Sequence, residues 1–332
     1  MGFIKDILGI IATNKLLFLC SKQTIFLTNH LVNDIKVDHI KHLYQFKNTV
    51  QFHQDCETLQ HNYQAINIDE LLVQKTIPEN SFLLTFDDGL AEIYKFIFPI
   101  LNNKNIKAIF FINPNFVNNQ KMLYKHKISL IIDDLTKKEF PEDKLNAICK
   151  ILDICYNTTN KFVHTIKNTK YSESDKLDTV CELLKIDIQQ YLYQHQPYIT
   201  KSQIQEMIDA GYYFGGHTMS HPRLNELSHE QQKAEILQSI NWLKSNFDIQ
   251  YSMFAFPFTD KNISRKLINE LFAYDQNILI FGNSGLKRDI DPRIIQRFSL
   301  ENPKYSAAKT IVVENLYKYY NMIIGKYKII RK

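Results

Sequence analysis

No run of apolar residues in this sequence approaches the ~18 that a membrane-spanning helix needs. The most apolar segment is residues 1–20, where Lys5, Asp6 and Lys15 interrupt it too early for a secretory signal peptide. We expect a helix that packs on the domain, and the alternative is an amphipathic helix that lies on a membrane surface. The missing export signal favours a cytoplasmic protein, with peripheral contact at the inner membrane left open.

The sequence also lacks paired cysteines and dense positive charge. Its five cysteines are scattered, their number is odd and no two form a Cys-x-x-Cys pair, so we expect free thiols in a reducing compartment. The net charge of +5 is mild and does not show the dense Lys/Arg pattern of a nucleic-acid-binding protein. With 45% hydrophobic and 23% charged residues, the composition is that of an ordinary soluble globular protein.

No internal repeat or low-complexity linker divides the chain, and short apolar runs recur along it. Helical patterns lie between many of these runs; the segment 228–247, for example, repeats apolar residues at helical spacing. Alternating strands and helices favour an α/β fold with a parallel sheet covered by helices, closed or nearly closed into a barrel. Seven runs are predicted to be the strands: Thr24–Asn29, Phe82–Phe86, Lys107–Ile112, Tyr212–Gly216, Met253–Phe256, Ile278–Phe281 and Ile294–Phe298.

A long helical stretch separates the third strand from the fourth. Residues 117–201 contain no strong strand pattern, and their apolar residues recur at helical spacing. We interpret them as a helical insertion that lines one side of the substrate cleft. The whole chain, 1–332, is then a single domain with a core at about 22–300. A basic C-terminal tail is placed at about 303–332, and its last residues, 317–332, are expected to be solvated or else to lie on an anionic membrane surface.

Two adjacent carboxylates, Asp87 and Asp88, follow the second strand directly. Like charges at a half-buried strand end repel each other, so a compensating group is needed nearby. Far along the chain, His217 and His221 lie four residues apart after the fourth strand, and Pro222 favours a tight turn over a helix there. Two imidazoles and a carboxylate are a common ligand set for a catalytic divalent metal ion. For the histidine spacing alone, a solvent-facing pair is the alternative.

Taken together, three segments resemble one known family. They are TFDDG at residues 85–89, HTMSHP at 217–222 and FAFPFT at 254–259. The resemblance is to the polysaccharide deacetylases, also called the NodB-homology family or carbohydrate esterase family 4. It implies a NodB-like, distorted (β/α)7 barrel. It also implies a metal-dependent hydrolase that removes an acetyl group from an N-acetylated sugar of a cell-envelope polysaccharide or of its lipid-linked precursor.

The same resemblance implies roles for individual residues. Asp87 matches the catalytic base of the family, and Asp88, His217 and His221 match its ligands for a divalent metal ion, usually Zn²⁺. Phe258 lies where the third motif supplies a backbone N–H to the oxyanion. A cation held by Asp88 would also make two neighbouring carboxylates tolerable, because it neutralises one of them.

The general acid of the family has no counterpart at its usual place. It is a late histidine in most members, but no histidine follows His229 in this sequence. His30, after the first strand, is the candidate by resemblance to the circularly permuted branch, which includes poly-N-acetylglucosamine deacetylases. The alternative is a strand-end histidine whose hydrogen bonds are satisfied within the fold.

The third motif also departs from the family, since FAFPFT lacks the arginine that often precedes the Pro-aromatic pair. A guanidinium near Asp87 would keep that carboxylate charged and oriented. Arg297, in the last predicted strand, is the candidate substitute, and a surface arginine is the alternative.

Three functions remain open at this point. The altered motifs leave room for a non-catalytic carbohydrate-binding relative, and the fold also serves hydrolases of other non-peptide C–N bonds. Retention of the four residues Asp87, Asp88, His217 and His221 favours the metal-dependent carbohydrate deacetylase. Its expected partner is an N-acetylated glycan or glycolipid, and a nucleic acid is not expected.

Overall fold

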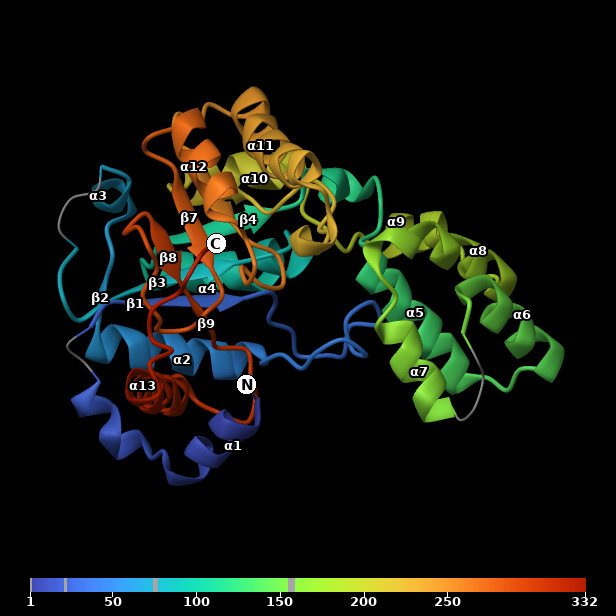
Figure 1. The fold of residues 1–332 in the computed structure, drawn as a ribbon, viewed down its shortest axis with the longest axis horizontal. Helices are drawn as coiled ribbons and strands as arrows, with labels where there is room; N and C mark the ends of the chain where they lie inside the picture. Colours follow the sequence, from blue (N-terminus) through green and yellow to red (C-terminus); the bar gives the residue numbers. More distant parts are fainter. Residues whose placement is uncertain (1, 21–22, 74–76, 155–158) are drawn as a thin grey trace.

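The structure is a computed structural model that describes residues 2–20, 23–73, 77–154 and 159–332. Within these residues, parallel strands form one sheet in the order β8-β7-β6-β5-β4-β3-β1-β9, and the short β2 pairs with β3 (Figure 1). The strands are β1 (Ile25–Asn29), β2 (Gln64–Ala65), β3 (Ser81–Phe86), β4 (Ala108–Ile112), β5 (Tyr213–Gly216), β6 (Met253–Ala255), β7 (Leu279–Gly282), β8 (Ile294–Gln296) and β9 (Phe298–Ser299).

The sheet curves into a nearly closed barrel through its last strand. β8 pairs with β7 and β9 pairs with β1, so the continuous segment 294–299 joins the two ends of the sheet. Only Arg297 separates β8 from β9. The prediction of a distorted, NodB-like (β/α) barrel is therefore confirmed. All seven predicted strands are present, the last one split at Arg297, whereas the two-residue β2 was not predicted.

Side chains alternate between the barrel interior and the helical layer along each strand, as the two-residue period of a strand requires. On β3, Leu84 and Phe86 pack outward in a cluster that includes helix residues, whereas Leu83 packs inward against Phe111 and Phe281. Both faces of these strands are apolar because helices cover a parallel sheet from outside. The same alternation carries on past the strand ends, where it directs polar side chains into the mouth of the barrel.

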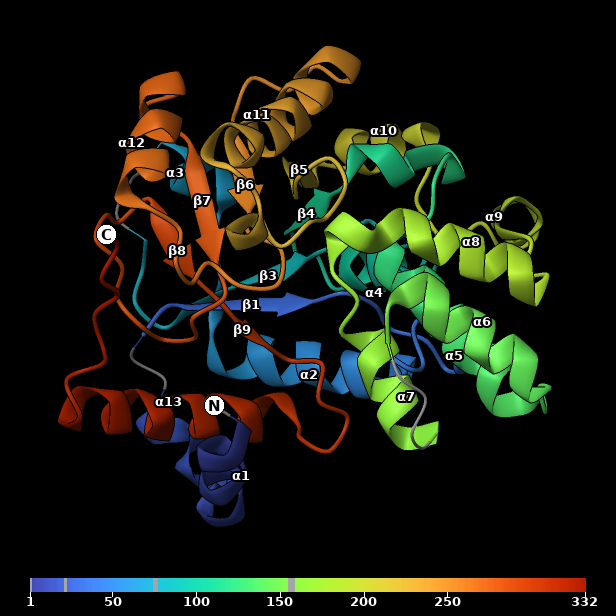
Figure 2. The same cartoon turned by 45° about the vertical axis from the view of Figure 1, so that its right-hand side comes forward.

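Helices surround the barrel on most sides (Figures 1 and 2). Several begin at a Ser, Thr or Asn whose side chain accepts a hydrogen bond from the first turn, as at Ser228 before α11. The helices outside the insertion are α1 (Gly2–Ile11), α2 (Thr49–Asn62), α3 (Ile68–Leu72), α4 (Phe98–Asn103), α10 (Lys201–Asp209), α11 (His229–Asn246), α12 (Arg265–Tyr274) and α13 (Ala307–Ile323).

The predicted insertion follows β4, the third of the long strands, and is helical. Its helices have their own buried core and form a lobe beside the barrel (Figures 1 and 2). They are α5 (Tyr124–Lys137), α6 (Glu142–Leu152), α7 (Thr159–Lys167), α8 (Ser174–Leu184) and α9 (Ile188–His195).

The segment predicted as a C-terminal tail, 303–332, contains a packed helix, α13. α13 packs against α1 and α2 and buries Ile311 and Val312 in the main core. Near the chain end, Arg331 is buried in ion pairs with Asp260 and Asp289. Most residues from Met322 to Lys332 are nevertheless exposed. The helix was not predicted because Tyr- and Lys-rich residues from 317 onward follow its apolar face.

α1 packs on α13 through one side and leaves isoleucines exposed on the other. No helix in the described ranges is both long and apolar enough to cross a membrane. Cys20, Cys56 and Cys181 are buried, free thiols, whereas Cys155 lies outside the described residues.

Candidate active site

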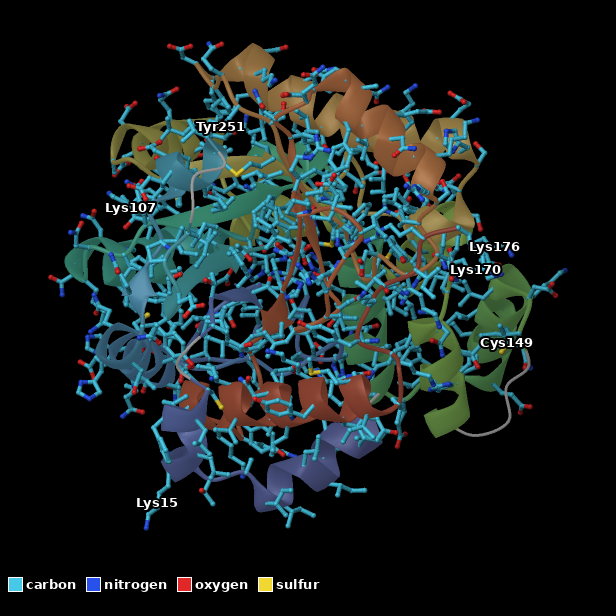
Figure 3. The ribbon with its side chains drawn as sticks, turned by 60° about the vertical axis from the view of Figure 1, so that its left-hand side comes forward. Lys15, Lys107, Cys149, Lys170, Lys176 and Tyr251 are labelled. Carbon is cyan, nitrogen blue, oxygen red and sulfur yellow. The ribbon has the colours of Figure 1, made fainter. Side chains whose placement is uncertain are left out.

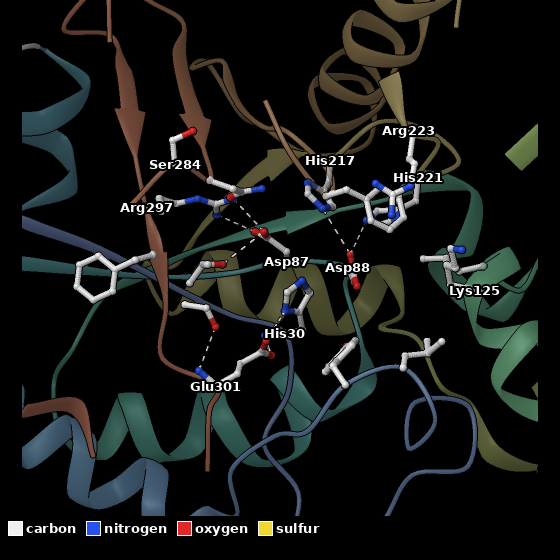
Figure 4. Close-up of a pocket in the computed structure, with 18 of the residues that line it drawn as sticks. His30, Asp87, Asp88, Lys125, His217, His221, Arg223, Ser284, Arg297 and Glu301 are labelled. Atoms are coloured by element: carbon white, nitrogen blue, oxygen red, sulfur yellow. Dashed lines mark hydrogen bonds and ion pairs between the residues drawn. The ribbon is translucent and has the colours of Figure 1, made fainter. Parts of the chain in front are cut away.

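The carboxyl ends of the barrel strands open into one cavity of about 560 Å³ (Figure 4). Period-two alternation places three side chains there: Asp87 continues the inward face of Leu83 and Thr85, and Arg297 follows the inward Ile295. His30 extends β1 in the same way. The cavity is lined by all seven residues singled out in the sequence: His30, Asp87, Asp88, His217, His221, Phe258 and Arg297.

Asp87 is held by Arg297 in a two-pronged ion pair. The two guanidinium nitrogens donate to the two carboxylate oxygens of Asp87 at 2.8 and 2.9 Å. Of the remaining guanidinium donors, two reach Thr85 Oγ1 at 2.8 Å and Asn283 Oδ1 at 2.9 Å, and the Nε–H donates to the carbonyl of Gly282 at 3.4 Å. Because both partners are buried, this pairing fixes the orientation of Asp87 and keeps its charge.

Asp88, His217 and His221 form a second, separate cluster beside Asp87. One potential ligand atom from each of the three residues lies within 4.8 Å of the others, and all three residues are buried. Nε2 of His217 lies 3.4 Å and Nε2 of His221 3.1 Å from Asp88 Oδ1 (Figure 4). The Nδ1–H of His217 donates to the carbonyl of Ala255 at 2.8 Å, which leaves the Nε2 lone pair directed at the cluster.

Two loops supply these ligands in unusual backbone conformations. Asp88 has a φ of 73°, His221 a φ of 59° and Thr218 a φ of 66°, in the left-handed region that non-glycine residues seldom adopt. The histidine loop is held from outside, since Asn113 Nδ2 donates to the carbonyl of His217. Glu235 accepts from the backbone N–H groups of Met219 and Ser220 at 2.8 and 3.0 Å. Strain of this kind persists where the surroundings impose it, and it is common at functional sites.

His30 is paired with a carboxylate on the other side of the cavity. Its Nδ1 lies 2.9 Å from Glu301 Oε2, and its backbone N–H donates to Glu301 Oε1 at 2.6 Å. Burial lowers the pKa of His30, but the charge of Glu301, with smaller contributions from Asp88 and Asp87, raises it to about 10. With Nδ1 engaged by Glu301, Nε2 is the ring nitrogen that can carry a proton to a ligand.

Phe258 lies beside the histidine loop with its own backbone in the left-handed region, at a φ of 54°. Its ring contacts that of His221, with 4.5 Å between the ring centroids. In the described part of the chain no acceptor takes the Phe258 backbone N–H. That N–H is therefore unpaired in a residue that lines the cavity.

The carboxyl groups of Asp87 and Asp88 both have lowered pKa values. Burial opposes ionisation of both carboxyl groups, yet Arg297 lowers the pKa of Asp87, and His221 and His30 hold the pKa of Asp88 well below its usual value. Burial lowers the pKa of His221. A divalent cation bound to these side chains would therefore take the place of the His221 proton, whose pKa burial already lowers.

The sequence did not reveal several residues that hold this site. Asn113 directly follows an apolar strand, as Asp87 does, and could have been found by that signal. Glu301 and Asn283 lie in the polar segment near the last strand, where nothing in the pattern separates them from surface residues. Glu235 is one polar residue among many on α11 and carries no signal at all.

The barrel and its mouth define the class of the protein as a NodB-like (β/α) barrel with a carboxylate–imidazole site at the carboxyl ends of its strands. Residues 74–275, more than half of the chain, match the sequence family described as polysaccharide deacetylase. The chain belongs to this family of carbohydrate deacetylases. A comparison with curated protein sequences found no significant match.

Solved structures agree with this fold. The deacetylase PplD of Streptococcus pyogenes, solved with acetate, superposes with a TM-score of 0.55 at 14% identity, covering 88% of this chain and 98% of PplD. IcaB of Ammonifex degensii superposes with a TM-score of 0.52 at 14% identity, covering 88% of this chain and 97% of IcaB. A de-N-acetylase of Aggregatibacter actinomycetemcomitans superposes with a TM-score of 0.50 at 17% identity, covering 87% of this chain and 99% of the de-N-acetylase. Identities this low establish the shared fold alone.

Proposed function

We propose that this protein is a metal-dependent deacetylase that removes the acetyl group from an N-acetylated sugar of a cell-envelope polysaccharide or of its lipid-linked precursor. One observation carries the proposal: Asp87, oriented by Arg297, lies next to the cluster of Asp88, His217 and His221 in a single cavity. A charged carboxylate beside a set of metal ligands is what amide hydrolysis by an activated water needs.

The side chains of the cluster fit a divalent cation. Asp88 Oδ1 is buried and has no hydrogen-bond partner among the described residues, although the Nε2 atoms of His217 and His221 are close to it. Lone pairs on all three atoms would repel one another unless a proton or a cation lies between them. A divalent ion, with Zn²⁺ as the expected one, would polarise the acetyl carbonyl and acidify a nearby water.

The remaining residues would divide the proton transfers. Asp87 takes the proton from the attacking water, because Arg297 keeps it charged at neutral pH. His30, protonated through its pairing with Glu301, gives a proton to the leaving nitrogen, since an amine anion is a very poor leaving group. The Phe258 N–H donates to the oxygen that becomes negative in the transition state.

The alternatives make different demands on the same cavity. A non-catalytic carbohydrate-binding relative has no need for a buried, oriented Asp87 or for a protonated His30 beside it. A hydrolase of another non-peptide C–N bond would use the same groups, so only the range of accepted substrates separates it from the proposed deacetylase.

We also propose that the enzyme contacts the cytoplasmic face of a membrane. Ile10, Ile11 and Leu19 are 82%, 60% and 63% exposed on the N-terminal segment. Lys15 projects from the same segment (Figure 3). Apolar side chains interspersed with lysine bind anionic lipid surfaces. Co-sedimentation with vesicles containing anionic lipid tests this, and Ile10→Glu is expected to abolish it; equal binding of both proteins would contradict the contact.

The function is tested by acetate release. Metal-loaded protein is incubated with N-acetylhexosamine oligomers and with lipid-linked N-acetylated sugars, and acetate and free amine are measured together. We expect both products in equal amounts, and their loss after exhaustive chelation. Activity that survives chelation, or acetate without a free amine, would contradict metal-dependent N-deacetylation.

A further inference from the structure

The cavity contains positive charge that the proposed chemistry does not use. Its acids are Asp87, Asp88 and Glu301, and each already has a cationic or imidazole partner. Its cations include Lys125, Lys167 and Arg223, and none of these has a carboxylate within ion-pair distance in the described parts of the chain. A cavity built only for a neutral acetylated sugar has no need of them.

Lys125 is fixed in place at the wall of the cavity. It lies on the first turn of α5, in the helical insertion, and its ammonium donates to the carbonyls of Lys167 and Thr169 at 2.7 and 3.2 Å. It also lies 5.0 Å from the centre of the Tyr124 ring. Burial and the charge of Arg223 lower the pKa of Lys125 to about 8, against a smaller opposing effect of the Glu226 carboxylate. The ammonium therefore remains largely charged at neutral pH, although Glu226 is not within ion-pair distance of it.

Arg223 approaches the cluster from the histidine loop. Its guanidinium lies over the Phe258 ring at 4.3 Å, and Phe258 in turn contacts His221. Stacking on an aromatic ring holds the flat guanidinium without using its N–H donors. Figure 4 shows Lys125 and Arg223 on the His221 side of the site, whereas Arg297 lies on the Asp87 side.

His126, the next residue after Lys125, adds a neutral donor to the lining of the same cavity. The hydroxyl of Tyr198 accepts the Leu123 N–H at 2.9 Å and lies 2.7 Å from His126 Nδ1. No other acceptor for the Tyr198 hydroxyl proton exists among the described residues, so this proton goes to Nδ1. The proton of neutral His126 is then on Nε2. His126 lines the cavity, and no described side chain forms a hydrogen bond with this Nε2.

We propose that Lys125, Arg223 and His126 form a subsite for a phosphate group carried by the acetylated sugar. The proposal rests on the proposed function and narrows its substrate to a phosphorylated N-acetylated sugar. Two half-buried cations repel each other, and a bound phosphate would offset that repulsion with charge-assisted hydrogen bonds. The guanidinium suits a two-pronged contact to phosphate oxygens, and the ammonium supplies a point charge.

Such a phosphate has two chemical sources. A sugar joined to a lipid carrier has its phosphate at the anomeric position, whereas a sugar inside a phosphodiester-linked polymer has it on another hydroxyl. N-acetylglucosamine 1-phosphate and 6-phosphate stand for these two sources, and unmodified N-acetylglucosamine is the neutral reference. The sugar phosphate that binds more tightly identifies the source of the phosphate.

Titration calorimetry on the metal-loaded full chain tests the subsite. We expect at least one of the two phosphates to bind about tenfold or more tightly than N-acetylglucosamine. Lys125→Met and Arg223→Gln should each remove about tenfold of this preference and leave the affinity for the neutral sugar unchanged. Lys121→Met, a matched lysine change on the exposed surface just before α5, should alter neither affinity.

A phosphate could also bind directly to a metal ion, so the titrations are repeated after chelation. The subsite would be overturned if the preference for the phosphorylated sugar were lost on chelation but unchanged in Lys125→Met and Arg223→Gln. Equal binding of neutral and phosphorylated sugars would overturn it as well. Arg223→Lys guards against a folding artefact, because it keeps the charge and should retain part of the preference. Acetate release is assayed separately: if no sugar yields acetate but the preference persists, the proposed function fails while the subsite stands.

Discussion

Arg297 and Asp87 form a buried ion pair with two hydrogen bonds, although 210 residues separate them in the sequence. The pair joins the strand that closes the barrel to the strand that carries the two adjacent carboxylates. Arg297 therefore both orients the proposed catalytic base and holds the last strand in its inward position.

We predict that Arg297→Met destabilises the protein by about 3–5 kcal/mol, because it leaves Asp87 buried without its partner. Arg297→Lys should lose less stability but still lower kcat/KM by ~10²-fold or more, since an ammonium cannot make the two-pronged contact. Urea unfolding and acetate release measure the two effects. A lysine variant with full activity would show that orientation of Asp87 is unimportant.

Asp87→Asn and Asp88→Asn should separate two neighbouring roles. Asparagine tolerates the positive φ of residue 88 better than alanine does, so Asp88→Asn removes the charge with little backbone strain. We expect Asp88→Asn to lose bound metal and Asp87→Asn to keep it while turnover falls by ~10²–10⁴-fold. Metal content by mass spectrometry, measured beside the rate, decides this. If both variants retain metal equally, Asp88 is not a ligand.

The pairing of His30 with Glu301 predicts how the rate depends on pH. A general acid acts only when protonated, and a pKa of about 10 keeps His30 protonated through neutral pH, with activity falling as the pH rises through that value. Glu301→Gln removes the main group that raises this pKa. The alkaline limb of kcat/KM should then move down by ~1–3 pH units.

The control for this shift is His30→Gln, which should lower the rate by ~10²–10⁴-fold and remove that limb altogether. An unchanged alkaline limb in Glu301→Gln would assign it to a different group. The same pair also affects stability: its contribution is complete below the ordinary histidine pKa of ~6.5 and is lost as the pH rises toward 10.

Much of the barrel could be predicted because local pattern and fold agree along the strands. β4 is an uninterrupted apolar run and β3, after its first residue, is interrupted only by Thr85, as a sheet covered on both faces requires. The inward direction of Asp87 also follows from the two-residue period of a strand, because Leu83 points inward and Asp87 lies four residues after it. The same alternation places Arg297 on the side of Ile295. The sequence of one strand alone, however, does not show which of its two sides faces the barrel interior.

Other features depend on contacts that no local pattern encodes. Glu301 meets His30 across 271 residues, and Lys125 reaches the cavity from an insertion whose own sequence predicts only helices. α13 was missed for another reason, since its apolar face is short and is followed by Tyr- and Lys-rich residues that dominate the composition. Such positions are decided by which elements the barrel brings together.

A last prediction concerns Arg331, whose guanidinium lies far from the proton transfers. It donates to Asp289 Oδ1 at 2.9 Å and to Asp260 Oδ2 at 2.8 Å. Asp260 in turn accepts from the Ser284 hydroxyl and from the Gln296 amide, which are the chain neighbours of Asn283 and Arg297. The C-terminal arginine thus supports the back of the strands that position the Asp87 pair.

Arg331→Met should therefore destabilise the protein by about 3–5 kcal/mol, because two carboxylates are left buried beside each other. Lys328→Met, a nearby change of an exposed cation, should be neutral within about 0.5 kcal/mol. Urea unfolding of both variants measures the difference, and metal content should stay unchanged since no metal ligand is touched. Equal stability of the two variants would mean that Asp260 and Asp289 are neutralised by protons in place of the guanidinium.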